Sequence, residues 1–117
     1  MEVVIKFGKR RIVVRNVEKC KGVKKFVGLM FKKRENANAI LFEFEKPTRT
    51  SIHSFFCPCF VALWINDKGE IMEYEFVKPN RIINPKKKFV ELLEVPSNKK
   101  YKHVPRFFSL EMEKFKK

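Results

Sequence analysis

Glutamine is absent from this 117-residue chain, and aspartate, glycine and histidine are scarce. Four glycines leave little material for a Gly-rich loop that cradles a phosphate, and neither a Gly-x-Ser-x-Gly elbow nor a His-Glu-x-x-His pattern occurs. One aspartate, Asp67, and two histidines, His53 and His103, supply few groups for acid–base catalysis. We therefore expect a protein that binds and does not catalyse.

Cysteines and long apolar runs are also few. The three cysteines make an odd number that fits no disulfide framework, which favours a reducing cytoplasm. Residues 1–6 contain an acid and a lysine and resemble neither a signal peptide nor an anchor. The uncharged run at residues 54–66 is shorter than the roughly 20 residues of a membrane-spanning helix. We expect a soluble, cytoplasmic protein that needs no cofactor and does not enter a membrane.

One group of residues has the composition of a metal site. On an extended strand His53, Cys57 and Cys59 share one face, and thiolate with imidazole suits zinc. A structural zinc site needs four ligands, and Cys20 is the only further thiol. Cysteine is among the most buried residue types, so we favour packing in the core as the explanation of these residues. We predict no metal and keep a site of Cys20, His53, Cys57 and Cys59 as the alternative hypothesis.

The abundant feature is positive charge. Lys and Arg number 27 against 13 Asp and Glu, a net charge of +14. The excess lies in residues 1–34, 78–88 and 99–117, whereas residues 35–77 are net acidic. A surface built from basic termini and loops is typical of proteins that meet a polyanion. The alternative is surface charge of the kind that heat-adapted proteins carry, since lysine is abundant and glutamine is missing.

Lysine clusters with neighbouring aromatics indicate where a nucleic acid would bind. Phosphates attract the cations and bases stack on aromatic rings. Without a base-reading motif, such clusters imply little sequence choice. We predict a binding or interaction module whose partner the sequence does not identify, with non-specific RNA or DNA binding as the alternative. The candidate residues for that alternative are Lys86, Lys87, Lys88, Lys99, Lys100, Tyr101, Lys102 and Arg106.

The apolar pattern predicts an α+β, mainly β fold in one domain of residues 1–117. Apolar and β-branched runs predict strands at residues 3–7, 11–17, 39–45 and 89–95, and a hairpin over residues 51–77 that turns at 66–69. Residues 26–30 indicate one short helix, and residues 78–88 an exposed basic loop. Residues 107–115 fit both a strand and a helix, and we favour the strand. These elements make an antiparallel sheet, either open or closed as a small barrel.

Four segments carry a resemblance to a known family. They are Gly-Leu-Met-Phe at 28–31, Ile-Leu-Phe-Glu-Phe at 40–44, the apolar strand and turn at 56–69, and Leu-Leu-Glu-Val-Pro at 92–96. In this order and spacing the chain resembles the DUF 192 family, also called uncharacterised protein family 0127, over about residues 25–96, with a basic segment at 97–117 outside it. The resemblance implies a small β-rich domain with a short helix and no established activity. Cys59-Phe60-Val61 stands where the family commonly has Pro, Ile or Leu, and Asp.

Overall fold

The computed structural model describes residues 1–20, 29 and 32–115. A 3-10 turn, Lys99–Tyr101, precedes the helix α1, His103–Phe115. The strands in chain order are β1 Val3–Phe7, β2 Arg10–Val14, β3 Glu18–Cys20, β4 Ile40–Thr48, β5 Ile52–His53, β6 Phe60–Ile65, β7 Ile71–Val77, β8 Ile82–Ile83 and β9 Phe89–Pro96. The chain is therefore mainly β, with one α-helix among the described residues.

A mixed five-stranded sheet forms the middle of the molecule, in the order β3-β4-β9-β6-β7. The pair β3–β4 is parallel, and the other neighbours are antiparallel. All six residues of β6, Phe-Val-Ala-Leu-Trp-Ile, are buried, because apolar side chains cover both faces of this central strand. Within the described residues the sheet is open, with β3 and β7 at its edges, so closure into a barrel is unconfirmed.

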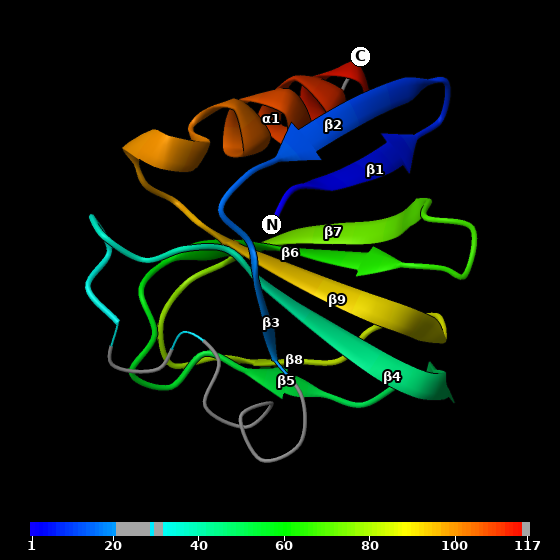
Figure 1. Ribbon diagram of the computed structural model, residues 1–117, viewed down its shortest axis with the longest axis horizontal. Coiled ribbons are helices and arrows are strands. Elements are labelled where there is room, and N and C mark those ends of the chain that lie inside the picture. Colours follow the sequence, from blue (N-terminus) through cyan, green and yellow to red (C-terminus); the bar gives the residue numbers. More distant parts are fainter. Residues whose placement is uncertain (21–28, 30–31, 116–117) are drawn as a thin grey trace.

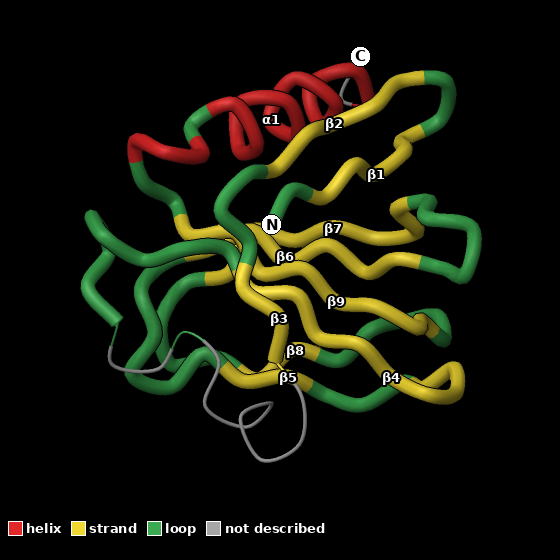
Figure 2. Tube along the Cα trace, in the orientation of Figure 1, coloured by secondary structure: helices red, strands yellow, loops and turns green. Residues whose placement is uncertain are grey.

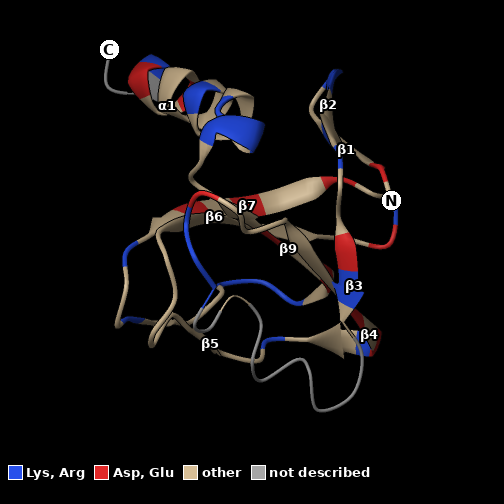
Figure 3. Cartoon of the chain, turned by 60° about the vertical axis from the view of Figure 1, so that its left-hand side comes forward, with Lys and Arg blue, Asp and Glu red and all other residues tan. Residues whose placement is uncertain are grey.

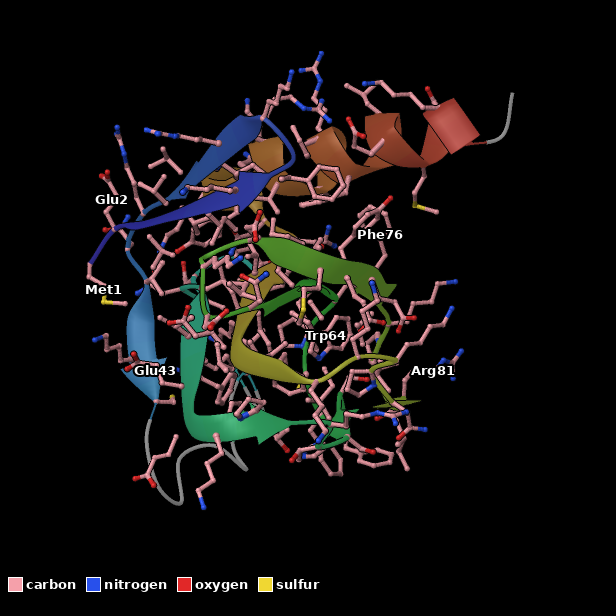
Figure 4. All side chains as sticks on the ribbon, turned by 90° about the vertical axis from the view of Figure 1, so that its right-hand side faces the viewer. Met1, Glu2, Glu43, Trp64, Phe76 and Arg81 are labelled. Carbon is pink, nitrogen blue, oxygen red and sulfur yellow. The ribbon has the colours of Figure 1, made fainter. Side chains whose placement is uncertain are left out.

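Two layers cover the two faces of this sheet. The β1–β2 hairpin and α1 lie on one side, and the short β5–β8 pair lies on the other (Figures 1 and 2). Successive side chains of β9 point to opposite faces of the sheet. Leu93 packs in the core under α1, and Leu92 packs in the core on the side of β5 and β8. The labelled Trp64 lies in this second core (Figure 4). The fold thus has two apolar cores that share one sheet.

The helix corrects our preference for a strand at residues 107–115. A strand would have placed Phe108, Leu110 and Met112 on one buried face, yet Leu110 and Met112 are exposed. The buried stripe is Val104, Phe108 and Glu111, at the spacing of four and three residues that a helix requires. This stripe includes a carboxylate, which the Arg10 guanidinium of β2 neutralises in a salt bridge. Apolar periodicity therefore missed one member of the buried face.

Most of the expected strands are confirmed. The β6–β7 hairpin turns as predicted: the side-chain oxygen of Asn66 accepts hydrogen bonds from the backbone N–H groups of Lys68 and Glu70, both at 2.9 Å. Gly69 takes φ +76°, a conformation that favours glycine. The parallel strand β3 was not predicted, because three residues are too few to show alternation. Strand β8 lies inside the segment that we expected to be a loop throughout.

Three further expectations concern a short helix, membrane-spanning helices and strand β5. The short helix expected at residues 26–30 lies, except for Leu29, outside the described residues. Within the part of the chain that the structure describes, no helix is long and apolar enough to cross a membrane. Strand β5, which we expected to belong to the strand of β6, is separate and pairs with β8 through Ile52 and His53.

Candidate anion-binding site

Strand β9 separates the two lysine clusters that the sequence suggested as binding residues. Lys86, Lys87 and Lys88 precede its first residue, whereas Lys99 and Lys102 follow its last. A strand of eight residues is about 25 Å long. The two clusters therefore lie at opposite ends of the sheet and do not form one continuous contact surface.

The first cluster is an exposed loop attached to the sheet by its backbone. The N–H groups of Lys86 and Lys87 donate to the carboxylate of Glu73 on β7, at 2.9 to 3.1 Å. All three lysine residues of the loop are exposed. Glu73 adds a negative charge beneath the loop, so the loop is less basic than its sequence implies.

Tyr101 does not have the role that the sequence suggested. Only 1% of this residue is exposed, because the 3-10 turn directs it into the core below α1. Its hydroxyl donates to the carbonyl of Asn16 and accepts from the N–H of Ala39. A buried ring offers no face on which a base can stack, so Tyr101 is removed from the candidate binding residues.

Around this turn, Asn98 organises the second cluster. Its side-chain oxygen accepts from the N–H of Lys100, and its amide nitrogen donates to the carbonyls of Arg34 at 2.8 Å and Ala37 at 2.9 Å. The Nε of Arg34 in turn donates to the carbonyl of Ser97 at 2.7 Å. These bonds join a loop before β4 to the segment after β9, so Arg34 lies beside residues 63 to 65 positions later in the chain.

A pocket of about 560 Å³ opens where these two segments meet. Three cationic side chains line it and one carboxylate, Glu35, opposes them. Helix α1 begins beside the pocket, so the positive end of the helix dipole adds to the field. The pocket is lined by Arg34, Glu35, Ser97, Asn98, Lys99, Lys102 and Pro105. Figure 3 shows lysine and arginine residues gathered at the start of α1.

A second, smaller hollow of about 300 Å³ lies on the other side of the turn, lined by Val13, Arg15, Lys100 and His103. The Nζ of Lys100 donates to the side-chain oxygen of Asn38 at 2.8 Å, and the ring of His103 lies 2.9 Å from the carbonyl of Val13. Both groups therefore already have partners within the protein. Arg106, the remaining candidate, is exposed on the first turns of α1 but does not line either hollow.

Arg34 is the pocket residue that sequence reasoning missed. The signal was the run Lys32-Lys33-Arg34, within the basic residues 1–34, from which we chose no candidate binding residue. Nothing in the local pattern places this loop beside Lys99 and Lys102. Its position depends on Asn98, whose amide reaches two carbonyls of the loop.

The zinc hypothesis finds no support in the geometry. Among residues 1–20, 29 and 32–115, no three His, Cys, Asp or Glu side chains come together as a metal site would require. Cys57 is buried in the second core and its thiol lies 3.5 Å from the carbonyl of Phe55. Burial and then the charge of Glu94 raise the pKa of Cys57 to about 11, so the thiol is protonated at neutral pH.

Glu94 is a buried carboxyl that the sequence did not single out. It lies in the middle of the sheet, paired with Ile40 of β4 on one side and Ala62 of β6 on the other. Burial raises its pKa to about 8. The only sequence signal was its place among four apolar residues of β9, Leu92, Leu93, Val95 and Pro96.

Comparison with known proteins supports the fold and leaves the site unassigned. No family model and no curated protein matches the chain. A protein of unknown function from Novosphingobium aromaticivorans DSM 12444 has a similar structure, with a TM-score of 0.66 and 14% identity over 82% of this chain and 72% of that chain. A "putative transcription regulator" from Sinorhizobium meliloti 1021 gives a TM-score of 0.68 and 22% identity over 81% and 78% of the two chains. At these identities the likeness shows the fold alone.

Proposed function

We propose that this chain is a non-catalytic binding module that holds the phosphates of a nucleic-acid backbone in the basic pocket beside α1. The observation that carries the proposal is the convergence of Arg34, Lys99 and Lys102 on one hollow. Guanidinium and ammonium groups are the usual protein partners of phosphate oxygens, and Arg presents a planar fork suited to them.

The charge of the whole chain supports a polymeric partner over a single small anion. At +14 the protein attracts polyanions from a distance, because many weak charges act together over a Debye length. Phosphates are identical along the polymer, so cations without base contacts bind with little sequence choice. We therefore expect RNA and DNA of different sequence to bind with similar affinity.

We also propose that the chain is a divergent member of the DUF 192 family. In support, two of the four segments that carry the resemblance lie on the interior strands β4 and β9, and a third contains all of β6. The stated departure, Cys59-Phe60-Val61, lies at the start of β6, and five of the seven pocket residues, Ser97 to Pro105, belong to the basic segment outside the resemblance. The proposed site is thus a property of this chain and not one carried over from the family.

Paired alanine variants test the binding site. Lys99 and Lys102 are exposed and line the pocket, whereas Lys87 and Lys88 are exposed at the other end of β9. Each double variant removes two charges, so the net charge of the two variants is equal. Fluorescence anisotropy with labelled oligonucleotides at several salt concentrations measures affinity and its salt dependence.

The expected result is a selective loss. K99A/K102A weakens binding for every sequence, and its slope of log affinity against log salt is about two units shallower, one for each lost phosphate contact. In K87A/K88A the affinity and the salt slope change less than in K99A/K102A. If the two variants lose affinity equally, the attraction is general and the pocket is not the site. If the unchanged protein does not bind nucleic acid at near-physiological salt, the proposed function is wrong and the positive charge is a general property of the surface.

A further inference from the structure

Three exposed apolar side chains, two of them aromatic, lie on neighbouring segments on the β5–β8 side of the sheet. Phe55 is 40% exposed and Phe56 65% exposed, on the loop between β5 and β6. Ile82, 64% exposed, is the first residue of β8, directly after the loop that leads from β7. We call residues 54–57 and 78–82 the aromatic tip. Three large apolar side chains in water indicate a contact surface.

A buried serine holds the two loops of the tip together. Ser54 is fully buried; its hydroxyl donates to the carbonyl of Lys78 at 2.6 Å and accepts from the N–H of Arg81 at 2.8 Å. Its backbone N–H donates to the carbonyl of Arg81, and its carbonyl accepts from the N–H of Asn80, both at 2.9 Å. The tip is therefore preorganised, which lowers the entropy lost on binding.

Backbone strain is stored in the same loops. Phe56 takes φ +60° and Asn80 φ +61°, in the left-handed region. Asparagine tolerates this region, but for a bulky aromatic residue it is uncommon and costs about 1 kcal/mol or more. Glycine or asparagine would adopt this conformation at lower cost, so the phenylalanine at position 56 lowers the stability of the loop.

One of the two rings, that of Phe55, is part of a stack. The ring of Phe55 stacks on that of His53, with centroids 5.4 Å apart and planes 25° from parallel. A planar platform of this kind can be extended by the flat face of a nucleobase, whereas an acyl chain gains nothing from the parallel arrangement. The geometry therefore favours a nucleobase over a lipid surface.

The tip is joined to the basic pocket through Ser97. The N–H of Ser97, which lines the pocket, donates to the carbonyl of Cys59 at 3.0 Å, and its carbonyl accepts from Arg34. Phe56 is three residues from Cys59, so the chain places its backbone within about 10 Å of that bond. Pocket and rings thus lie at the same end of the sheet, within the reach of a few nucleotides.

Charge around the tip also suits a polyanion. Residues 46–66 and 76–90 contain no acidic side chain, and Lys78 and Arg81 are exposed on the tip itself. Figure 4 shows Arg81 on the far side of Trp64 from Phe76, so this cation lies on the β5–β8 side of the sheet. A nucleic-acid strand that extends from the pocket to the tip therefore meets the cations Lys78 and Arg81. It meets no carboxylate from residues 46–66 or 76–90.

We propose that the ligand is single-stranded nucleic acid, with its phosphates in the basic pocket and its bases stacked on Phe55 and Phe56; this inference rests on the proposed function. Paired bases in a duplex are already stacked on each other and do not present their faces to a protein ring. A base–aromatic stack accepts any base, so we expect little sequence preference.

The test compares ring removal at the tip with ring removal elsewhere. Phe56→Asn removes the ring with a residue that tolerates φ +60°, and Phe55→Ala removes the other ring. Phe76→Ala is the matched control, since Phe76 is 37% exposed on β7, outside the tip. Phe56→Tyr restores a ring. Each variant is titrated with fluorescent oligo-uridine, oligo-thymidine and duplexes of the same length, and its melting temperature is recorded.

We expect Phe55→Ala and Phe56→Asn each to bind single strands about ten-fold more weakly, with unchanged salt slope and little change for duplexes. Phe56→Tyr and Phe76→Ala bind as the unchanged protein does. Equal binding of single strands and duplexes, unaffected by either ring, would overturn this inference and leave the proposed function standing. Failure of the unchanged protein to bind any nucleic acid would overturn both. Ring-dependent sedimentation with phosphatidylcholine–phosphatidylserine vesicles, without ring-dependent nucleic-acid binding, would assign the tip to membranes.

Discussion

The hydroxyl oxygen of Tyr101 lies 3.1 Å from the carbonyl oxygen of Asn16, to which it donates a hydrogen bond across 85 positions of the chain. The same oxygen accepts from the N–H of Ala39 at 3.0 Å. One phenol thus ties the end of the β1–β2 hairpin and the start of β4 to the turn before α1. The turn also carries Lys99 of the basic pocket, so the tyrosine supports the site without lining it.

Replacement of Tyr101 by Phe tests this role. The variant keeps the buried ring but leaves the N–H of Ala39 without its acceptor, which costs about 1 to 3 kcal/mol of the free energy of unfolding. Urea denaturation measures the change. Tyr74→Phe is the control, because the hydroxyl of Tyr74 makes no hydrogen bond to any residue that the structure describes. Equal stability of both variants would show that the hydrogen bonds of Tyr101 add nothing.

Glu94 makes the stability depend on pH in an unusual direction. Its folded pKa, about 8, is above the ordinary value of 4.5, so the folded protein holds a proton that the unfolded chain releases. The contribution of Glu94 to stability is therefore full below about pH 4.5, falls as pH rises, and levels off above about 8. Glu94→Gln removes this fall and raises the free energy of unfolding by on the order of 3 kcal/mol at neutral pH. Denaturation across this pH range measures it, and parallel curves for the two proteins would contradict the prediction.

The two cysteines beside the aromatic tip differ in reactivity. The pKa of Cys57 is raised from 9.0 to about 11, so at neutral pH its thiolate population is about 100-fold smaller than that of an ordinary thiol. Cys59 is only half-buried. In single-cysteine variants we expect iodoacetamide to modify Cys59 much faster than Cys57. In denaturant the rates become equal, and equal rates in the folded protein would exclude a protected Cys57.

Interior strands were predictable from the chain because their signal is local. The apolar runs of β6 and β9 show on their own that these strands are buried. The helix α1 was not predictable in this way, because Phe108, Leu110 and Met112 also alternate as the residues of a strand do. Its buried face includes Glu111, and a carboxylate enters that face only because Arg10 arrives from a distant hairpin.

The candidate site was predictable only in part. The basic composition and the Lys99–Lys102 region were visible in the sequence, and Lys99 and Lys102 do line the pocket. The aromatic candidate beside these lysines, Tyr101, is buried, whereas Phe55 and Phe56, from an apolar run, are exposed. A loop has no regular alternation of polar and apolar residues from which exposure can be predicted. Which side chains of this loop are exposed depends on tertiary hydrogen bonds such as those of Ser54.

The amino-acid sequence by itself determined the strong positive charge, the β-rich class and the interior strands, because these depend on composition and on the period of neighbouring residues. Tertiary structure alone decided which cations meet. Arg34 and Lys99 become neighbours because Asn98 and Ser97 bond a loop before β4 to the segment after β9. Such contacts depend on the folding of strands far apart in the chain, and no local pattern of residues specifies them.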